Sequence, residues 1–453
     1  MMRCLLALAS LFLPTVIGFA LVRVCIPGGK SCCRHDWLRL SLGIGVGFGV
    51  CSCLFFVWLI AYGAVHREYI AVEFGLAILL SALSAYGANT CCLCDPARNR
   101  ETALTRWKHP LRVVFALLFL CACLSFAIES RLHPEGQGDA WAIWNLRARF
   151  LVRAGAQWRT AFSGSLFWSH PDYPLLLPGS VARSWVYTGA ETTIVPIGIA
   201  ALFTFGGVGV LTAGVSILSG CENGLLAGIV LLGTPSFLRL GAAQYADVPL
   251  AFFFLASIAL LTLRDRIPVS GIALLGLTAA LSGWTKNEGL LFFALLLVAM
   301  KWTSRAAGAF VAGASGVLVL LVVFKLTLAP PNYLAQSGGI LLRDVMDPSR
   351  YLTVAAGFVY QLTNFGGTRL NPLAPFLAAL FLVRHNVMYT SRSAALIPGG
   401  MLAGVFLVYL ITPEDPAWQM AWSLDRLLLQ LWPAVLFTGL QLADFRSRKD
   451  LPA

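Results

Sequence analysis

The feature that most limits how this chain can fold is the recurrence of apolar segments about 20 residues long. A helix needs about 20 apolar residues to cross a hydrocarbon core about 30 Å thick. Backbone N–H and C=O groups in lipid must find partners within the protein, so these segments should be helices. Hydrophobic residues make up 58% of the chain and charged residues only 12%, which favours a multi-pass membrane protein over a soluble domain.

Together the segments predict an all-α, polytopic membrane helical bundle with about 12–14 transmembrane helices. Pro14 interrupts the first segment and no clear small-residue cleavage site follows, so we expect an uncleaved span rather than a signal peptide. The segment 351–365 is also apolar but ends at Asn364 and two glycines; a crossing, a re-entrant segment and an interfacial helix all fit it. The other predicted spans are 4–26, 38–64, 69–93, 111–129, 192–218, 223–238, 244–263, 269–284, 288–302, 306–328, 373–383, 394–411 and 424–441.

One long polar stretch, from Ser130 to Ala190, separates two groups of apolar segments. It contains a Trp- and Arg-rich helical pattern between Ala140 and Arg153. As an interfacial helix, this pattern would place Trp141, Trp144, Leu146 and Phe150 on lipid, and Arg147, Arg149 and Arg153 toward headgroups or phosphates. The sequence therefore predicts a long outer loop that carries interfacial helices.

Basic residues indicate the orientation of the bundle, because short cytoplasmic loops carry an excess of Lys and Arg. The densest loop contains Arg98, Arg100, Arg106, Lys108 and Arg112, and the tail contains Arg446, Arg448 and Lys449. These basic loops and anionic membrane lipids explain the net charge of +12, so we expect no nucleic acid partner. The basic groups fall on one side, which is then cytoplasmic, if segment 351–365 does not cross fully. In that case segments 130–190, 286–288, 328–350 and 412–425 and residue Asp247 face outward, at the exterior or periplasmic side of a plasma (inner) membrane.

The cysteines argue against a disulfide-stapled exterior. All twelve lie between Cys4 and Cys221, and none lies in the polar stretch. Two clusters stand out on the side expected to be cytoplasmic: Cys32 and Cys33 with His35, and Cys91 and Cys92 with Cys94. Their spacing differs from paired C-x-x-C zinc motifs, so reduced thiols are the favoured interpretation and a metal site is the alternative.

Two motifs in the polar stretch resemble the first outer loop of GT-C integral-membrane glycosyltransferases. They are Gly138–Asn145, with the sequence GDAWAIWN, and His170–Pro178, with the sequence HPDYPLLLP. The nearest branch is the bacterial group that is similar to protein mannosyltransferases and lipopolysaccharide sugar transferases (family 39). Three later segments fit the same pattern: Gln244–Leu250, Gly283–Gly289, and Thr412–Asp415 leading to Ser423–Arg426.

The resemblance implies a division of the chain into a GT-C-like catalytic core, residues 111–441, and a cytoplasmic tail, residues 442–453. It covers most of the chain from about Phe115 onward. The family normally places the acidic loop after its first helix, whereas here three additional spans, 4–26, 38–64 and 69–93, come before span 111–129 and the loop. Residues 1–110 are therefore interpreted as an added N-terminal bundle of transmembrane helices, with a rearranged start of the fold over residues 1–93 as the alternative.

The resemblance also implies a reaction, the inverting transfer of a sugar from a polyprenyl-phosphate donor to an acceptor hydroxyl on the non-cytoplasmic side. The acceptor would be a glycolipid, a polysaccharide or a protein. Asp139 matches the acidic base position of the family, and one carboxylate suffices as the general base of a single displacement. The lipid phosphate gains negative charge as it leaves, so cations should face it. The candidates are Arg426, Lys286, Arg147 and Arg149.

Each candidate has a structural alternative. Asp139 and Asp247 each precede or open a helix and would serve as caps. Lys286 and Glu288 would form an ion pair within a solvated turn instead of lining the site. His170 and Asp172 lie in a proline-stiffened run, which favours a structural lid over catalysis. Arg426 would pair with Asp425 at the start of a helix instead of binding phosphate.

No cofactor is expected, and a divalent cation coordinated by Asp139, Asp172, Asp247 and Glu288 stays an open alternative. The glycines at 43, 45, 47 and 49 lie in an apolar span and favour close helix contact over a nucleotide loop. Rival functions are a transporter or flippase of a lipid-linked molecule, a ligase that transfers a whole glycan, and a non-catalytic scaffold. A transporter would need ionisable groups deep in the membrane, whereas Glu73 and Lys325 are close enough to span ends to snorkel.

Overall fold

The computed structural model describes residues 2–28, 33–86, 107–300, 302–331, 344–367, 371–373, 375–377 and 389–442. Helices joined by turns make up this part of the chain, and no strand occurs in it. Within these residues eight helices are long and apolar enough to cross a membrane, or nine if one bent pair counts as a single span. This confirms a helical membrane bundle. The predicted span 373–383 lies largely outside the described residues, and so do Cys32 and the cysteines at 91, 92 and 94.

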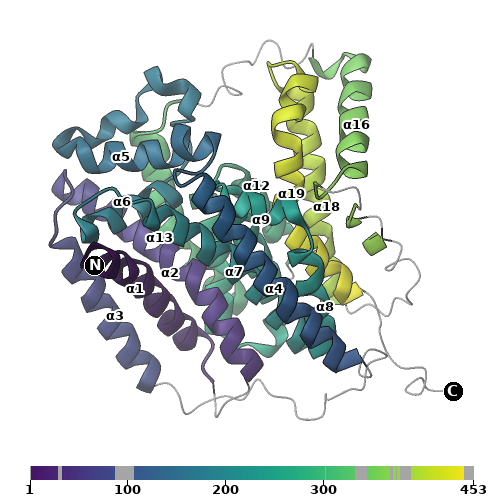
Figure 1. Ribbon diagram of the computed structural model, residues 1–453, viewed down its shortest axis with the longest axis horizontal. Coiled ribbons are helices and arrows are strands. Elements are labelled where there is room, and N and C mark those ends of the chain that lie inside the picture. The colour runs from purple at the N-terminus through teal and green to yellow at the C-terminus, as the bar shows by residue number, and fades with distance from the viewer. Residues whose placement is uncertain are drawn as a thin grey trace.

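The helices fall into three groups along the chain (Figure 1). The first group is α1 Met2–Cys25, α2 Cys33–Tyr62, α3 Tyr69–Tyr86 and α4 Lys108–Leu132. The polar stretch forms the π-helix η4 Ala140–Trp144, α5 Asn145–Arg153, the 3₁₀ helices η5 Gly155–Phe162 and η6 Gly164–Ser169, and α6 Leu176–Thr188. The third group is α7 Ile194–Ser219, α8 Cys221–Leu232, α9 Pro235–Ala242, α10 Asp247–Leu263, η7 Arg264–Arg266, α11 Val269–Thr285, α12 Glu288–Ala299, α13 Ser304–Thr327, α16 Pro348–Thr363, α18 Tyr389–Ile411 and α19 Pro416–Leu442.

Glycines allow α1 and α2 to approach each other closely, as the glycine-rich span predicts. A Cβ atom on Gly47 would lie 1.7 Å from the Pro14 carbonyl oxygen, and one on Gly18 would lie 1.8 Å from the Gly43 carbonyl oxygen. Such contacts exclude any side chain larger than hydrogen, so van der Waals contact between the two backbones replaces side-chain interdigitation. Gly45 leaves room for the aromatic ring of Phe252 of α10. The N-terminal helices therefore share one hydrophobic core with the rest of the bundle.

The segment predicted as one span over 223–238 is a broken helix. α8 and α9 meet at an angle of 67° across Gly233 and Thr234. Pro235 occupies the first turn of α9, where its missing N–H costs nothing, but it prevents the residue before it from continuing α8. Because of this break, α9 carries the chain into the turn that precedes α10.

The polar stretch is not wholly a surface loop, because every residue of α6 is buried. α6 packs against α1, α2 and α5. At its start the carbonyl of Leu175 accepts a hydrogen bond of 2.9 Å from the Ser52 hydroxyl of α2. The second half of the predicted outer loop therefore enters the bundle. Figure 1 shows α5 and the short helices beside it covering one end of the bundle, at the upper left.

A fully buried ion pair ties α6 to α3. Both Arg183 and Glu73 have side chains that are 0% exposed, and two guanidinium nitrogens lie 2.6 Å from the two carboxylate oxygens. The Tyr187 hydroxyl also donates to Glu73, and Arg183 donates to the Ser10 carbonyl of α1. The expectation that Glu73 snorkels to a membrane surface is wrong, because a buried partner satisfies it instead.

The last helix, α19, begins at Pro416 rather than near the predicted position 424. Asp425 and Arg426 therefore lie inside a continuous helix and not at its start. Pro416 occupies the first helical position, and the Asp415 carboxylate accepts a hydrogen bond of 2.8 Å from the Ala417 N–H, as an N-cap does. The polar residues of 423–426 interrupt the hydropathy pattern without interrupting the helix.

Candidate active site

Several polar segments meet at what we call the polar end of the bundle, defined by residues 133–175, 243–247 and 285–288. Asp139 is one of the residues of this end that contact α19. It occupies the N-cap position of η4, but its backbone is α-helical and its side chain accepts no capping hydrogen bond. Instead its Oδ2 atom lies 2.6 Å from Nη1 of Arg426. The prediction that Asp139 caps the helix is therefore wrong. The guanidinium of Arg426 contacts Asp139 and not Asp425, the partner that the alternative had predicted.

The pair between Asp139 and Arg426 stays open to solvent, since the two side chains are 32% and 22% exposed. The guanidinium carbon of Arg426 lies 5.1 Å from the centre of the Tyr245 ring. Among the described residues, Nε of Arg426 has no hydrogen-bond partner. Burial, together with the negative charge of Asp139, raises the pKa of Tyr245, so the phenol stays neutral at pH 7. The pair thus joins one carboxylate and one incompletely satisfied guanidinium beside an aromatic face.

Beneath this pair lies a buried second pair. Nζ of Lys286 is 3.2 Å from Oδ1 of Asp247, and the two side chains are 5% and 2% exposed. Gln430 also donates to that oxygen from α19. Because Gln430 follows Arg426 by four residues, one face of α19 contacts both pairs. Asp247 is therefore an ion-pair partner within the bundle, and not only a residue that opens α10.

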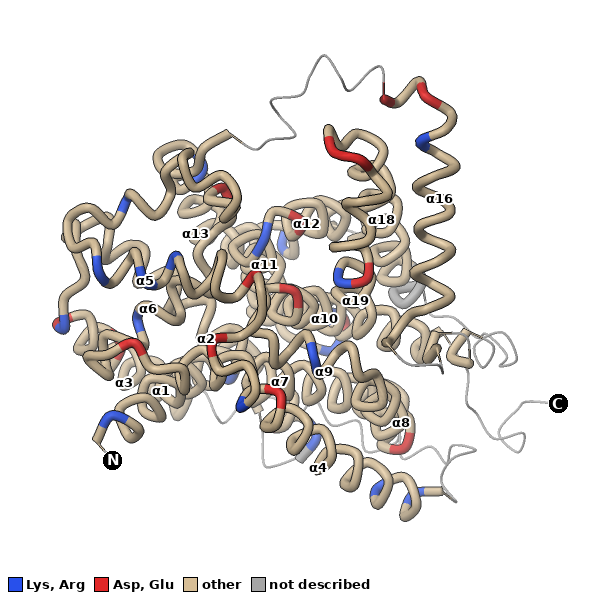
Figure 2. The backbone as a smooth tube through the Cα atoms, turned by 45° about the horizontal axis from the view of Figure 1, so that its top comes forward, with Lys and Arg blue, Asp and Glu red and all other residues tan. Residues whose placement is uncertain are grey.

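Lys286 has a second ion-pair contact, to Glu288 at 2.9 Å, so the predicted local ion pair is present. Burial disfavours its charged form, but the carboxylates of Asp247 and Glu288 outweigh that effect and raise the pKa of Lys286. Lys286 is consequently a permanent cation. Figure 2 shows the acidic and basic stretches of α10, the α11–α12 turn and α19 gathered near the centre of the view.

The segment His170–Tyr173 is held by a stack of aromatic rings. Tyr173 lies between Trp144 and His170, with ring centres 5.6 and 5.0 Å away and interplanar angles of 7° and 15°. Nζ of Lys286 is 5.6 Å from the centre of the Tyr173 ring. Trp144 is 2% exposed, so its predicted place on lipid is wrong, whereas Trp141 is 56% exposed.

Arg147 does not reach phosphates or headgroups, as the interfacial-helix interpretation expected. It is 2% exposed, and its two terminal nitrogens donate to the carbonyls of Ser169, His170 and Tyr173 at 2.6–2.9 Å. Burial lowers the pKa of Arg147 to about 10, so it keeps its charge at pH 7. Arg147 thus positions the segment that carries His170 and Asp172.

Asp172 is held through α13 and the α11–α12 turn. Its Oδ2 accepts a hydrogen bond of 2.7 Å from the Asn287 amide, and its backbone carbonyl accepts one of 2.6 Å from Lys325. Lys325 also donates to Asn287, at 2.6 Å. Lys325 does lie near the end of a span, yet it reaches a protein partner and not lipid headgroups.

His170 is a strained position in the same segment. Its backbone is left-handed, with φ of 48°, which is uncommon for a residue with a side chain. Burial is the main cause that lowers the pKa of His170, so the imidazole is neutral at pH 7. These contacts hold the segment that carries His170 and Asp172 in place, and its role as a structural lid stays a prediction.

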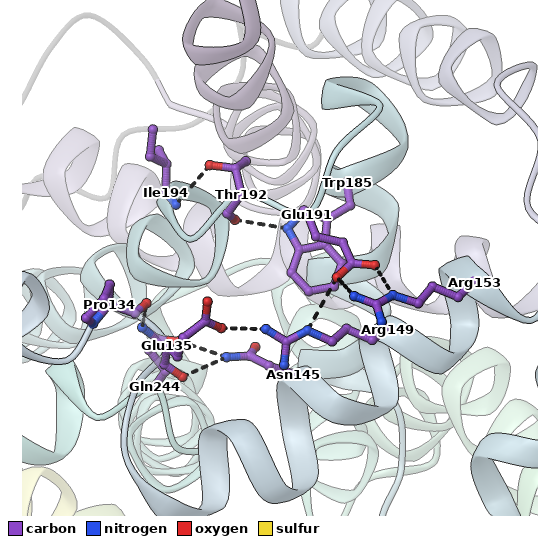
Figure 3. Close-up of polar contacts among 10 residues, drawn as sticks. All are labelled: Pro134, Glu135, Asn145, Arg149, Arg153, Trp185, Glu191, Thr192, Ile194 and Gln244. Atoms are coloured by element: carbon purple, nitrogen blue, oxygen red, sulfur yellow. Dashed lines mark hydrogen bonds and ion pairs between the residues drawn. The ribbon is translucent and has the colours of Figure 1, made fainter.

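Arg149 lies in an ion-pair network at the surface of the polar end (Figure 3). It contacts Glu135, and its Nε lies 3.4 Å from Oε2 of Glu191. Arg153 contacts Glu191 through two hydrogen bonds of 2.6 Å. The sequence predicted a lipid phosphate as the partner of Arg149, whereas its partners in the structure are the two carboxylates on either side of it.

Two amides fasten this network to the core of the site. Asn145 donates to Oε1 of Gln244 at 2.9 Å, and Gln244 donates to the Pro134 carbonyl at 3.1 Å (Figure 3). Gln244 has a left-handed backbone, with φ of 63°. It immediately precedes Tyr245, so the strained turn fixes the aromatic ring against Arg426.

Sequence reasoning did not propose Tyr173, Tyr245, Asn287 and Gln430 as site residues, and it considered Lys325 only as a residue that snorkels. Tyr173, Tyr245 and Asn287 lie within the quoted motifs, which offered a signal. Gln430 had only its spacing of four residues from Arg426. Within the described part of the chain, no three His, Cys, Asp or Glu side chains gather as ligands for a metal ion. Comparisons with known protein families, with characterised proteins and with solved structures found no match.

Proposed function

We propose that this protein is a membrane glycosyltransferase that transfers a sugar from a polyprenyl-phosphate donor to an acceptor hydroxyl, with inversion at the sugar carbon. One observation carries the proposal: Asp139 and Arg426, 287 residues apart in sequence, form a solvent-accessible pair at 2.6 Å. A general base and a phosphate-binding cation are the two groups that such a transfer needs most. The proposal places them on the non-cytoplasmic face of the inner membrane.

In the proposed reaction the donor phosphate binds Arg426 and competes with Asp139 for its guanidinium. Asp139 is then free to accept the proton of the acceptor hydroxyl. The acceptor oxygen forms a bond to the sugar carbon while the bond from that carbon to the phosphate oxygen breaks. The electron pair of the broken bond leaves with the phosphate, and Arg426 stabilises the charge that develops there.

The buried pair between Asp247 and Lys286 supports this arrangement from below. Gln430 and Arg426 lie one helical turn apart, so fixing Gln430 on Asp247 also fixes the height and rotation of Arg426. Preorganised charges need no reorientation as the transition state forms. The charge of Lys286 is compensated by Asp247 and Glu288, so its role is to hold Asp247 in place and, through Gln430, the face of α19 that carries Arg426.

Replacement of Asp139 by Asn in living cells tests the proposal, because Asn preserves shape and removes basicity. We expect the loss of one glycan modification by about 10²- to 10⁴-fold, the contribution of a positioned general base. Mass-spectrometric profiling of lipid-linked and envelope glycans measures it. Glu135→Gln is the matched control, since Glu135 is a carboxylate at the same end that forms an ion pair with Arg149 at the surface.

An unchanged glycan profile in Asp139→Asn cells, with the variant present in the membrane, would refute the proposed role of Asp139. If the Asp139→Asn variant no longer exports the unmodified lipid-linked molecule, the protein is instead a transporter or flippase. Transfer of an entire glycan in one step, rather than of one sugar, would identify a ligase.

A further inference from the structure

Two exposed tryptophans lie on α19 outward from Arg426. Trp418 and Trp422 are 58% and 69% exposed. Residues four apart on a helix share a face, so Trp418, Trp422 and Arg426 form a row with steps of about 6 Å along the axis. The next member of the row, Gln430, contacts Asp247 inside the bundle. This row therefore runs without a break from the buried pair to the surface.

An exposed carboxylate indicates that this face of α19 is in contact with water. Asp425 is exposed, and it follows Trp422 by three residues and Trp418 by seven, which places all three on one side of the helix. Since α19 begins at Pro416, Asp425 lies deeper along the helix than either tryptophan. An exposed carboxylate is strongly disfavoured among acyl chains. The two indoles above it consequently border water rather than the interior of the lipid layer.

We propose that Trp418, Trp422 and Asp425 form a carbohydrate subsite that binds a pyranose ring of the acceptor glycan. The C–H bonds of a pyranose carry partial positive charge, and an indole face is the negative pole of the ring quadrupole, so the two stack. The Asp425 carboxylate accepts hydrogen bonds from sugar hydroxyls. A ring stacked on Trp422 lies one helical turn from Arg426, and hence next to the reacting pair.

The identification of this sugar as the acceptor rests on the proposed function, whereas carbohydrate binding as such does not. The competing explanation for exposed tryptophans in a membrane protein is anchoring at the lipid interface. Trp168 of η6, which is 51% exposed and lies outside the row, provides a matched control for that explanation.

The test is saturation-transfer NMR on the full chain in lipid nanodiscs, with a panel of pyranose tri- to hexasaccharides and no lipid-linked donor. We expect at least one oligosaccharide to receive saturation through its ring protons. Trp418→Ala and Trp422→Ala should bind it about five- to tenfold more weakly, as the loss of one stacking face implies. Trp422→Phe keeps an aromatic face and should bind nearly as well as the unaltered protein, and Trp168→Ala should bind equally well.

Either of two results would overturn the subsite: no oligosaccharide binds at millimolar concentration, or the α19 variants bind as the unaltered protein does. Equal weakening in Trp168→Ala would also overturn it, in favour of interfacial anchoring. Asp139→Asn separates this proposal from the proposed function, since it should keep oligosaccharide binding while losing transfer. Binding that depends on Trp422, combined with transfer that survives in Asp139→Asn, would retain the subsite and reject the proposed role of Asp139.

Discussion

Arg426 is the residue at which the contacts of the candidate site meet. Its guanidinium contacts Asp139 and lies over the Tyr245 ring, and the helix that carries it also places Gln430 on Asp247. A guanidinium is planar and binds a phosphate through two parallel hydrogen bonds, whereas an ammonium group is a point charge. A positive charge alone is therefore not sufficient to bind the phosphate at this position.

Replacement of Arg426 by Lys should lower the rate of sugar transfer by about 10- to 100-fold, because the bidentate phosphate contact is lost while the positive charge stays. Steady-state turnover of a polyprenyl-phosphate sugar by the purified variant measures the effect. Arg149→Lys is the control, since Arg149 is taken up by two carboxylates at the surface. Turnover by Arg426→Lys equal to that of the unaltered protein would remove Arg426 from the site.

His170 should make the fold sensitive to mild acid. Burial lowers its pKa below the ordinary value of 6.5, so the unfolded chain binds a proton at a higher pH than the folded protein does. The free energy of unfolding is therefore unaffected by His170 above about pH 6.5. It decreases as the pH falls from there toward the lowered pKa of His170.

Thermal unfolding in detergent between pH 7.5 and 5 measures this effect. His170→Asn should flatten the dependence, because Asn tolerates the left-handed backbone and does not titrate. Identical pH dependence in the variant and the unaltered protein would assign the acid sensitivity to another group.

At the scale of elements, α6 is the least expected part of the fold. A helix with an arginine at its centre would ordinarily lie at a surface, yet Arg183 is fully buried against Glu73 of α3. Charges taken out of water need close partners, and this pair has two hydrogen bonds of 2.6 Å as well as contacts to Tyr187 and Ser10. The ion pair consequently fixes α6 against α1 and α3, and with it the end of the polar stretch.

Replacement of Glu73 by Gln should lower the free energy of unfolding by about 3–5 kcal/mol, because it leaves Arg183 buried without a compensating charge. The double variant Glu73→Leu/Arg183→Met should recover most of that loss. Denaturant titration in mixed micelles measures both.

Glu191→Gln serves as the comparison, since its partner Arg153 is 66% exposed and such pairs contribute about 1 kcal/mol or less. A loss for Glu73→Gln no larger than that for Glu191→Gln would contradict the account of α6.

Hydropathy predicted most of the long helices well, because a span of uniform apolar residues has few alternatives in lipid. It failed where local chemistry intervenes: Pro235 breaks the predicted span 223–238, and Asp425 with Arg426 made α19 look shorter than it is. Hydropathy also could not predict that α6 is buried. Its residues are typical of a surface helix unless the buried partner of Arg183 is known.

The candidate site was predicted in part. The acidic and basic residues of the polar end could be identified from charge in an apolar chain, and the structure brings Asp139, Asp247, Lys286, Glu288 and Arg426 together. The partners could not be identified, because a contact between residues 139 and 426 leaves no local pattern. Arg147 shows the limit clearly: its sequence context suits a headgroup contact, but three carbonyls of the neighbouring turn accept hydrogen bonds from its two terminal nitrogens instead.

At the scale of the whole molecule, two ion pairs at the polar end of an apolar bundle are arranged in layers. The outer pair is accessible, the pair below it is buried, and α19 connects the two. This arrangement suits a substrate that has a polar headgroup and an apolar tail, because the head can reach Arg426 while the tail stays in lipid. In the proposed sugar transfer the outer pair reacts with the substrate and the buried pair holds α19 in place.

The most direct test of this central claim is the release of polyprenyl phosphate from a radiolabelled polyprenyl-phosphate sugar by the purified protein in nanodiscs. We expect the unaltered protein to release it in the presence of an acceptor glycan, with inverted configuration at the transferred sugar, and Asp139→Asn to release it at least about 10²-fold more slowly. Release at equal rates by the two proteins, or none by the unaltered protein with any polyprenyl-phosphate sugar, would contradict the account.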